Sequence, residues 1–215
     1  MASVCYSPLK GKIIRVVRLD ECGAVVTGAD NMIVSDGFVS VQFAPQYEDG
    51  QEFIVKNANG DFCVNEKDAD RLKRINLTIN LCSVDTGVFD IILGADPITD
   101  GGDTVGGLFG EGANTTKFGF ELWSGVAGGA CGDEGNAQYE HLALGWVENA
   151  RLNDTTYEYG PAQITITAST HKAPDYGTGP FGILPTPFGA LDHMARYLTP
   201  VAPPEAACGL QALAA

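Results

Sequence analysis

Apolar and polar residues alternate along much of this chain, a pattern that favours strands over helices. In Ile75-Asn-Leu-Thr-Ile-Asn-Leu81 every odd-numbered residue is apolar and every even-numbered residue is polar. Such a segment turns one face toward a core and the other toward water or a neighbouring subunit. Further strands are predicted at residues 12–19, 24–27, 38–43, 52–56, 118–123, 141–152 and 163–169, with turns rich in glycine, asparagine and aspartate between them.

These strands predict a mainly β fold: an antiparallel β-sandwich or barrel-like domain with one flanking α-helix and long loops. The helix is expected at residues 84–93, where apolar residues recur at helical spacing and Gly94 follows. Two shorter helices are predicted at residues 68–74, which carry acidic and basic residues at opposite ends, and at residues 190–198.

Most of the chain, residues 11–199, is predicted to form a single domain. Residues 1–10 are expected to form an N-terminal arm, and residues 200–215, which hold two adjacent prolines and many alanines, a flexible C-terminal arm. Residues 96–116 are rich in glycine and acid and predict a long loop inserted in the domain. A second glycine-rich loop is expected at residues 125–136.

The formal charge is −14, and it is unevenly distributed. Residues 1–74 hold 9 basic and 11 acidic residues, whereas residues 75–215 hold 4 basic and 16 acidic residues. This acidic composition argues against a protein that binds nucleic acid tightly, because affinity for the phosphate backbone comes mainly from lysine and arginine. The asymmetry fits complementary contacts between identical subunits, and it equally fits an acidic surface that meets only solvent.

The targeting and redox signals of the chain are weak. No positively charged segment leads into an apolar stretch at the N-terminus, so we expect no secretion signal, and no apolar run is long enough to predict a membrane span. Six cysteines occur without a C-x-x-C pair. Their even number permits disulfides in an oxidising compartment, but reduced thiols are the preferred interpretation.

No enzyme motif stands out, and we expect no catalytic, cofactor or metal site. The chain lacks the G-x-S-x-G of serine hydrolases, its three histidines lie far apart, and its paired glycines precede no phosphate-binding lysine. Two weaker alternatives stay open. Paired carboxylates can come from distant strands, and Asp96, Asp100 and Asp103 could bind calcium weakly, although a solvated loop is the simpler interpretation.

Five segments carry a family resemblance: Tyr47-Glu-Asp-Gly50, Gly60-Asp-Phe-Cys-Val64, Leu77-Thr-Ile-Asn-Leu-Cys-Ser-Val-Asp85, Gly145-Trp-Val-Glu-Asn-Ala-Arg-Leu152 and Tyr176-Gly-Thr-Gly-Pro-Phe181. In this order they resemble the major tail proteins, or tail tube proteins, of siphophages that infect actinobacteria. The resemblance covers roughly residues 11–182. Each segment alone is a weak signal, and their order along the chain carries the resemblance.

The resemblance implies a structural virion protein and not an enzyme. It implies a β-sandwich flanked by a helix that assembles into hexameric rings, which stack into the hollow tail tube that delivers the genome. The implied partners are other copies of the chain and the tape-measure, tail-terminator and distal tail proteins, while DNA passes through without specific binding. Such a protein is made in the cytoplasm of the host bacterium and resides in the phage tail.

Candidate inter-subunit or lumen-facing residues come from the acidic loop and from the polar faces of two amphipathic strands. Acidic side chains in the lumen would repel DNA phosphates, so neutralising them is expected to slow DNA ejection. The candidates are Asp96, Asp100, Asp103, Glu111, Asn76, Thr78, Asn80, Thr165 and Thr167.

Two other functions compete with the tail tube. A phage head decoration protein would also be a compact β domain, but it would sit on a capsid and would not polymerise into tubes. A carbohydrate-binding β-sandwich would need an aromatic cleft, yet aromatic residues make up only 9% of the chain and no tryptophan cluster is visible.

Overall fold

The computed structural model describes residues 6–127, 138–157, 159–160 and 162–213. The described residues form a mainly β fold with one short α-helix, α1 (Thr86–Ile91), and two 3₁₀ helices, Pro174–Tyr176 and Pro180–Gly182. The strands are β1 (Pro8–Arg18), β2 (Gly28–Ser35), β3 (Phe38–Glu48), β4 (Glu52–Lys56), β5 (Phe62–Lys67), β6 (Arg71–Leu81), β7 (Asp96–Asp100), β8 (Asp103–Leu108), β9 (Phe118–Val126), β10 (Tyr139–Leu152), β11 (Ile164–Thr170), β12 (Ala195–Thr199) and β13 (Ala207–Leu213).

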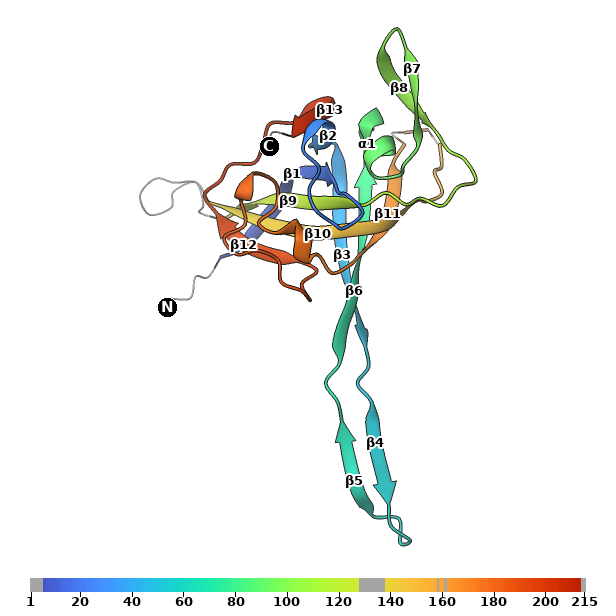
Figure 1. Ribbon diagram of the computed structural model, residues 1–215, viewed down its shortest axis with the longest axis vertical. Helices are drawn as coiled ribbons and strands as arrows, with labels where there is room; N and C mark the ends of the chain where they lie inside the picture. Colours follow the sequence, from blue (N-terminus) through green and yellow to red (C-terminus); the bar gives the residue numbers. More distant parts are fainter. Residues whose placement is uncertain (1–5, 128–137, 158, 161, 214–215) are drawn as a thin grey trace.

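Nine strands form one antiparallel sheet in the order β13-β2-β1-β9-β10-β11-β6-β3, with β12 paired to β10. In Figure 1, β9 and β10 run across the molecule while β3 and β6 run along its long axis, so the sheet folds over on itself. This arrangement confirms the predicted sandwich-like antiparallel β fold with one flanking helix.

The main core lies inside the folded sheet. The apolar residues of the alternating segment in β6, Ile75, Leu77, Ile79 and Leu81, are all buried there, as the period of two predicts. The helix α1 packs its apolar side against the same core. It begins where the Asp85 carboxylate accepts a hydrogen bond from Gly87 N at 2.9 Å, within the predicted range of residues 84–93.

A second core lies on the other face of the sheet, over β1, β9 and β10. There Val17 and Ala143 pack under Tyr176, Leu184 and Phe188, which come from the segment between β11 and β12. We call residues 171–194 the covering segment. It covers one face of the sheet with irregular backbone and two 3₁₀ helices. Because such backbone has no regular period, the sequence of this segment shows no pattern that predicts its position.

Two ribbons project from this body at opposite ends of its long axis (Figure 1). The strands β3 and β6 continue past the body and lead into the hairpin β4–β5; we call residues 46–74 the arm. The hairpin β7–β8 projects from the other end, beside α1.

Two predicted helices are wrong. Residues 71–74 belong to β6, because the facing strand β3 offers them a pairing partner, as in the pair Arg71 and Glu48. The charge distribution that suggested a helix reflects side chains that alternate across an exposed ribbon. Residues 195–198 belong to β12, which pairs with β10 at Ala195 and Ala143.

Three other expectations also need correction. The flexible C-terminal arm is wrong for residues 207–213, since β13 pairs with β2 and buries Leu213. The expected loop at residues 96–116 contains the hairpin β7–β8, whose turn is made by glycines. The N-terminal arm already joins β1 at Pro8, and its residues 1–5 lie outside the described residues. Most of the predicted second glycine-rich loop, residues 128–136, also lies outside them.

Candidate assembly surfaces

The arm is a two-stranded ribbon without a covering layer. Every residue from Gln51 to Arg74 is exposed, and β4 and β5 pair only with each other among the described strands. An isolated two-stranded ribbon is marginally stable in water, because it has no core to bury its apolar side chains. The arm therefore has the form of a segment that is completed by contact with another molecule.

Apolar side chains gather on this uncovered ribbon. Pairing of Val55 with Val64 and of Phe53 with Glu66 places Phe53, Val55 and Val64 on one face, where Phe53 is 44% and Val55 is 52% exposed. The opposite face carries Ile54. The large apolar side chains exposed along the arm are Tyr47, Phe53, Ile54, Val55, Phe62, Val64 and Leu72. Exposed apolar side chains gathered along one ribbon mark an interaction surface.

The arm is locally fixed where β3 and β6 lead into the hairpin β4–β5. Gly50 N donates to the Asp70 carboxylate at 2.9 Å, and Lys67 pairs with Asp70 at 3.0 Å. The hydrogen bond from Gly50, followed by Lys67, lowers the pKa of the Asp70 carboxyl. A Cβ atom at Gly50 would lie 1.8 Å from the Asp68 carbonyl oxygen, so only glycine fits at this crossing, where two segments of the backbone pass each other.

The hairpin β7–β8 at the opposite end is held by α1. Thr86 Oγ1 donates to the Thr104 carbonyl at 3.1 Å, and the rings of Phe89 and Phe109 meet edge to face at 5.5 Å. At its free end Asp100 faces Asp103 across a turn of two glycines with positive φ. The predicted residues Asp96, Asp100, Asp103 and Glu111 are all exposed and lie on this hairpin or in the segment after it. No group of metal-ligating side chains occurs among the residues that the structure describes.

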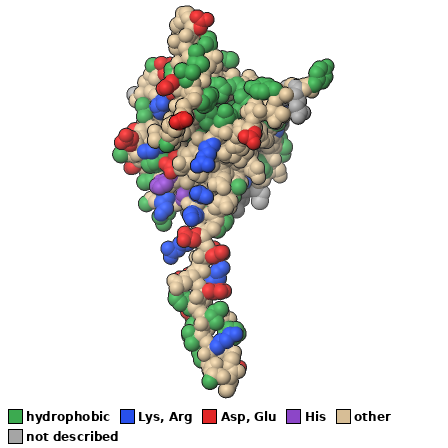
Figure 2. All heavy atoms as spheres, turned by 90° about the vertical axis from the view of Figure 1, so that its right-hand side faces the viewer, with side chains coloured by type: hydrophobic (Ala, Val, Ile, Leu, Met, Phe, Trp, Pro, Cys, Tyr) green, Lys and Arg blue, Asp and Glu red, His purple; other side chains and the backbone are tan. Residues whose placement is uncertain are grey.

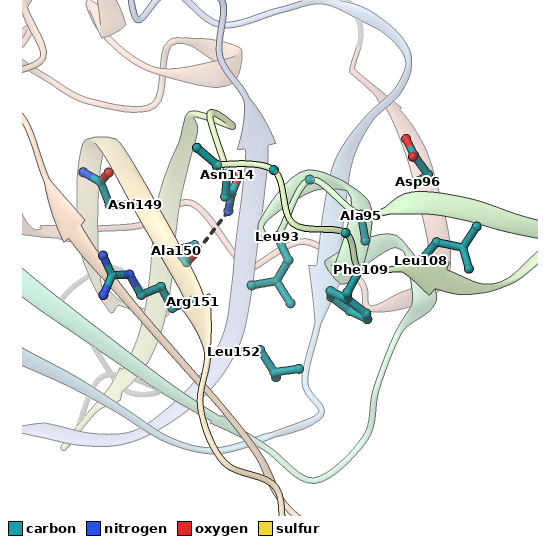
Figure 3. A pocket seen from close by; sticks show the side chains of 14 residues that line it. Leu93, Ala95, Asp96, Leu108, Phe109, Asn114, Asn149, Ala150, Arg151 and Leu152 are labelled. Carbon is teal, nitrogen blue, oxygen red and sulfur yellow. Dashed lines mark hydrogen bonds between the residues drawn. The ribbon is translucent and has the colours of Figure 1, made fainter.

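A groove of about 660 Å³ opens at the base of this hairpin (Figure 3). Its apolar lining includes Leu108, Phe109 and Leu152, of which the first two are more than half exposed. In Figure 3, Asn114 crosses the groove floor toward β10, where its side-chain nitrogen donates to the Ala150 carbonyl at 3.0 Å. At Asn149, φ is +57°, and the register of β10 against β11 shifts there. This bulge breaks the regular pairing of β10 just before Leu152.

The remaining predicted residues lie together on the outer face of β6 and β11. The register pairs Thr165 with Asn80 and Thr167 with Thr78, and Asn76 follows on the same face of β6. Thr165 Oγ1 donates to Asn80 Oδ1 at 2.7 Å, so the two strands share side-chain hydrogen bonds. These five side chains are uncharged. The structure thus separates the predicted set into an acidic hairpin and a neutral polar sheet face.

Sequence analysis missed a buried ionic network beneath the covering segment. Arg15 on β1 and Glu121 on β9 are register partners and form an ion pair, although their side chains are only 3% and 0% exposed. Tyr176 OH donates to Glu121 at 3.1 Å. Burial raises the pKa of Glu121, while the Arg15 charge opposes that rise, and burial raises the pKa of Tyr176. The available signal was a single charge inside each of two apolar runs, Arg15 within residues 13–17 and Glu121 within residues 118–126.

His141 continues this network toward β12. Its Nδ1 lies 2.6 Å from Tyr197 OH, which itself donates to the Ile183 carbonyl at 3.1 Å. Burial, and after it the Arg15 charge, lowers the pKa of His141 to about 3. Because Tyr176 and Ile183 belong to the covering segment, this network ties that segment to the sheet.

Comparisons with known proteins identify no relative of this chain. A scan against protein-family models gives no match, and a search of curated proteins gives none. In the described part of the chain, no helix has the length and apolar character needed to cross a membrane. Trp123 is buried and Trp146 partly buried, so neither tryptophan offers the open stacking platform of a carbohydrate-binding cleft.

Proposed function

We propose that this chain is a structural subunit that associates with copies of itself, and that its assembly is the tail tube of a tailed bacteriophage. The observation that carries the proposal is the arm: a ribbon with no covering layer and an apolar strip on its surface. Burying each half-exposed side chain of that strip would contribute roughly 1 kcal/mol, so several together supply a useful contact.

The form of the molecule favours a head-to-tail assembly. An arm that docks on a different surface of the next copy makes a heterologous contact, and such contacts build closed rings or open helical filaments. The strand β3 offers a further surface for contact between copies. Its only partner among the described strands is β6, so its other edge can pair with a strand of another copy. Hexameric rings that stack into a tube are the form expected from the family resemblance.

The neutral polar face of β6 and β11 is a suitable lining for a DNA conduit. Asn76, Thr78, Asn80, Thr165 and Thr167 carry no positive charge, so this face would not hold DNA phosphates. We propose that DNA passes along it without specific binding. Tape-measure, tail-terminator and distal tail proteins are the further partners that a tail tube needs, and a role in the virion requires no catalysis.

Sedimentation velocity over a range of concentrations tests the proposal. We expect the full chain to form larger species as its concentration rises, and a variant with residues 51–69 replaced by a short glycine-asparagine turn to stay monomeric. A matched control is Tyr157→Ser, which removes an exposed aromatic side chain outside the arm. Equal behaviour of the full chain and the shortened variant would contradict self-assembly through the arm and favour a subunit that docks elsewhere, such as on a capsid.

A further inference from the structure

We infer that in the assembly the arm of one copy lies antiparallel against the hairpin β7–β8 of the next copy. This inference rests on the proposed self-assembly and identifies its two contacting surfaces. The acidic end of β7–β8 meets basic residues at the root of the arm, and the apolar face of the outer arm covers the groove at the base of β7–β8.

The positions of the two ribbons make this a contact between copies. The arm and β7–β8 project from opposite ends of the molecule in Figure 1, so one copy cannot bring its own two ribbons together. When two copies are placed end to end, the arm of the first copy points toward the body of the second, and the β7–β8 hairpin of the second points toward the body of the first. The two ribbons then lie side by side and run in opposite directions.

Charges at the two ends are complementary. Arg71, Lys73 and Arg74 lie where the arm joins the body, and Ile75 N donates to Thr170 Oγ1 at 2.9 Å, which brings His171 and Lys172 to the same place. We call this set of five residues, Arg71, Lys73, Arg74, His171 and Lys172, the basic collar. Figure 2 shows lysine, arginine and histidine side chains gathered on the lower part of the body, above the arm, and acidic side chains at the free end of the molecule's other pole.

The charged groups at both ends are available for such a contact. Among the described residues, Asp100, Asp103 and the collar residues form no ion pair within 4.0 Å. Glu48 is the register partner of Arg71, and Asp70 precedes Arg71 in the chain. Lys73 and Arg74 are thus the better-placed partners for acids from another copy. Their contact with Asp100 and Asp103 would be strongest at low salt.

The arm is longer than the hairpin, but its apolar face begins at a matching distance. At about 3.3 Å per residue, Glu66, the register partner of Phe53, lies roughly 17 Å along the arm from Arg71, and Leu108 lies roughly 17 Å along β8 from Asp103. When the acidic end reaches the collar, the apolar face of the arm therefore reaches Leu108. Phe53, Val55 and Val64 would then cover the groove with its exposed Leu108 and Phe109.

A charge-swap series of the full chain tests the inference. The variant Asp100→Lys/Asp103→Lys and the variant Lys73→Glu/Arg74→Glu should each raise the concentration at which assembly begins by about tenfold or more. The variant that combines all four substitutions should return within about threefold of the unaltered chain, because the attraction is restored with reversed signs. Glu205→Lys, at an exposed acid that belongs to neither ribbon and does not line the groove, is the control and should assemble normally.

The outcomes separate this inference from the proposed function. Assembly of the unaltered chain together with normal assembly of both charge reversals would overturn the pairing of the two ribbons, and self-assembly would stand. Loss of assembly in both reversals without recovery in the combined variant would also overturn it. A chain that never assembles would overturn the proposed function and the inference with it. Circular dichroism of each variant checks that the body is folded.

Discussion

At the scale of single residues, the buried pair of Arg15 and Glu121 has the largest consequences for stability. The pair lies under the covering segment and is almost fully shielded from water. Its two charges are costly to bury and are tolerated because they neutralise each other and because Tyr176 donates to Glu121. Removing one member leaves the other as an uncompensated buried charge, whereas removing both leaves no buried charge and only takes the acceptor from Tyr176 OH.

We predict that Arg15→Met lowers the free energy of unfolding by about 3–5 kcal/mol, because Glu121 loses its counter-charge. The double variant Arg15→Met/Glu121→Leu should lose clearly less. Urea denaturation of the three proteins measures both values. Equal losses in the single and double variants would mean that Glu121 costs no stability when it is left without Arg15.

His141 makes the stability depend on pH in a defined direction. Its pKa is about 3 in the folded protein against 6.5 ordinarily, so below pH 6.5 the unfolded chain binds a proton that the folded protein does not. The stability associated with His141 is complete above pH 6.5 and declines as the pH falls toward 3. Burial lowers the pKa of His193 as well, which acts in the same direction, while the raised pKa of Glu121 acts in the opposite direction.

From pH 7 to pH 5, we predict that the free energy of unfolding falls by about 2 kcal/mol more for the unaltered protein than for His141→Gln. Urea denaturation at the two pH values gives this difference directly. An identical loss in both proteins would show that His141 accepts a proton equally well in the folded and unfolded states.

At the scale of secondary-structure elements, the arm depends on a backbone crossing that only glycine permits. Gly50 approaches Asp68 so closely that any side chain would push the two strands apart. Because the crossing lies outside both cores, its distortion should change the direction of the arm more than the stability of the body.

We expect Gly50→Ala to weaken self-association while the thermal unfolding midpoint of the body stays within a few degrees of the original. The matched control is Gly125→Ala, which lies outside both ribbons and the groove, and where an added Cβ would meet only the end of the Lys12 side chain at 3.2 Å and Leu9 beyond it. Sedimentation velocity and a thermal melt of both variants provide the comparison. Normal association of Gly50→Ala would show that the crossing does not orient the arm.

The clearest of the elements that sequence analysis predicted have a side-chain pattern set by a core. The alternation in residues 75–81 comes from burial on one side of β6, and the spacing in residues 84–93 comes from packing of α1. The arm has no core, so residues 71–74 show three charges around Leu72 and no burial pattern, and such a segment does not distinguish an exposed strand from an exposed helix. Likewise β13 is identified by its partner β2 and not by any periodicity of its own.

The candidate site was predictable in part. The pairing of Thr165 with Asn80 follows from two amphipathic strands that share a polar face, and that face was recognisable in the sequence. The acidic residues were correctly identified as exposed, but their position on a hairpin opposite the arm depends on the fold. The apolar face of the arm was missed because it appears only when the register of β4 and β5 is known.

At the scale of the whole molecule, the uneven charge of the chain corresponds to charges of opposite sign near the two ends of the molecule. The excess of acid in residues 75–215 includes the exposed end of β7–β8, and the basic residues of residues 1–74 include three at the root of the arm. A body with a projecting ribbon at each end and opposite charges near them is suited to end-to-end repetition. The same molecule has a neutral polar sheet face between the two ends, where a conduit could be lined.

Negative-stain electron microscopy of the purified full chain at high concentration tests this assembly most directly, with the variant shortened at residues 51–69 as its control. We predict rings and stacked hollow tubes for the full chain and separate small particles for the shortened variant. Uniform small particles of the full chain, unchanged at the highest concentration and at low salt, would contradict the proposal that this protein builds a tube from copies of itself.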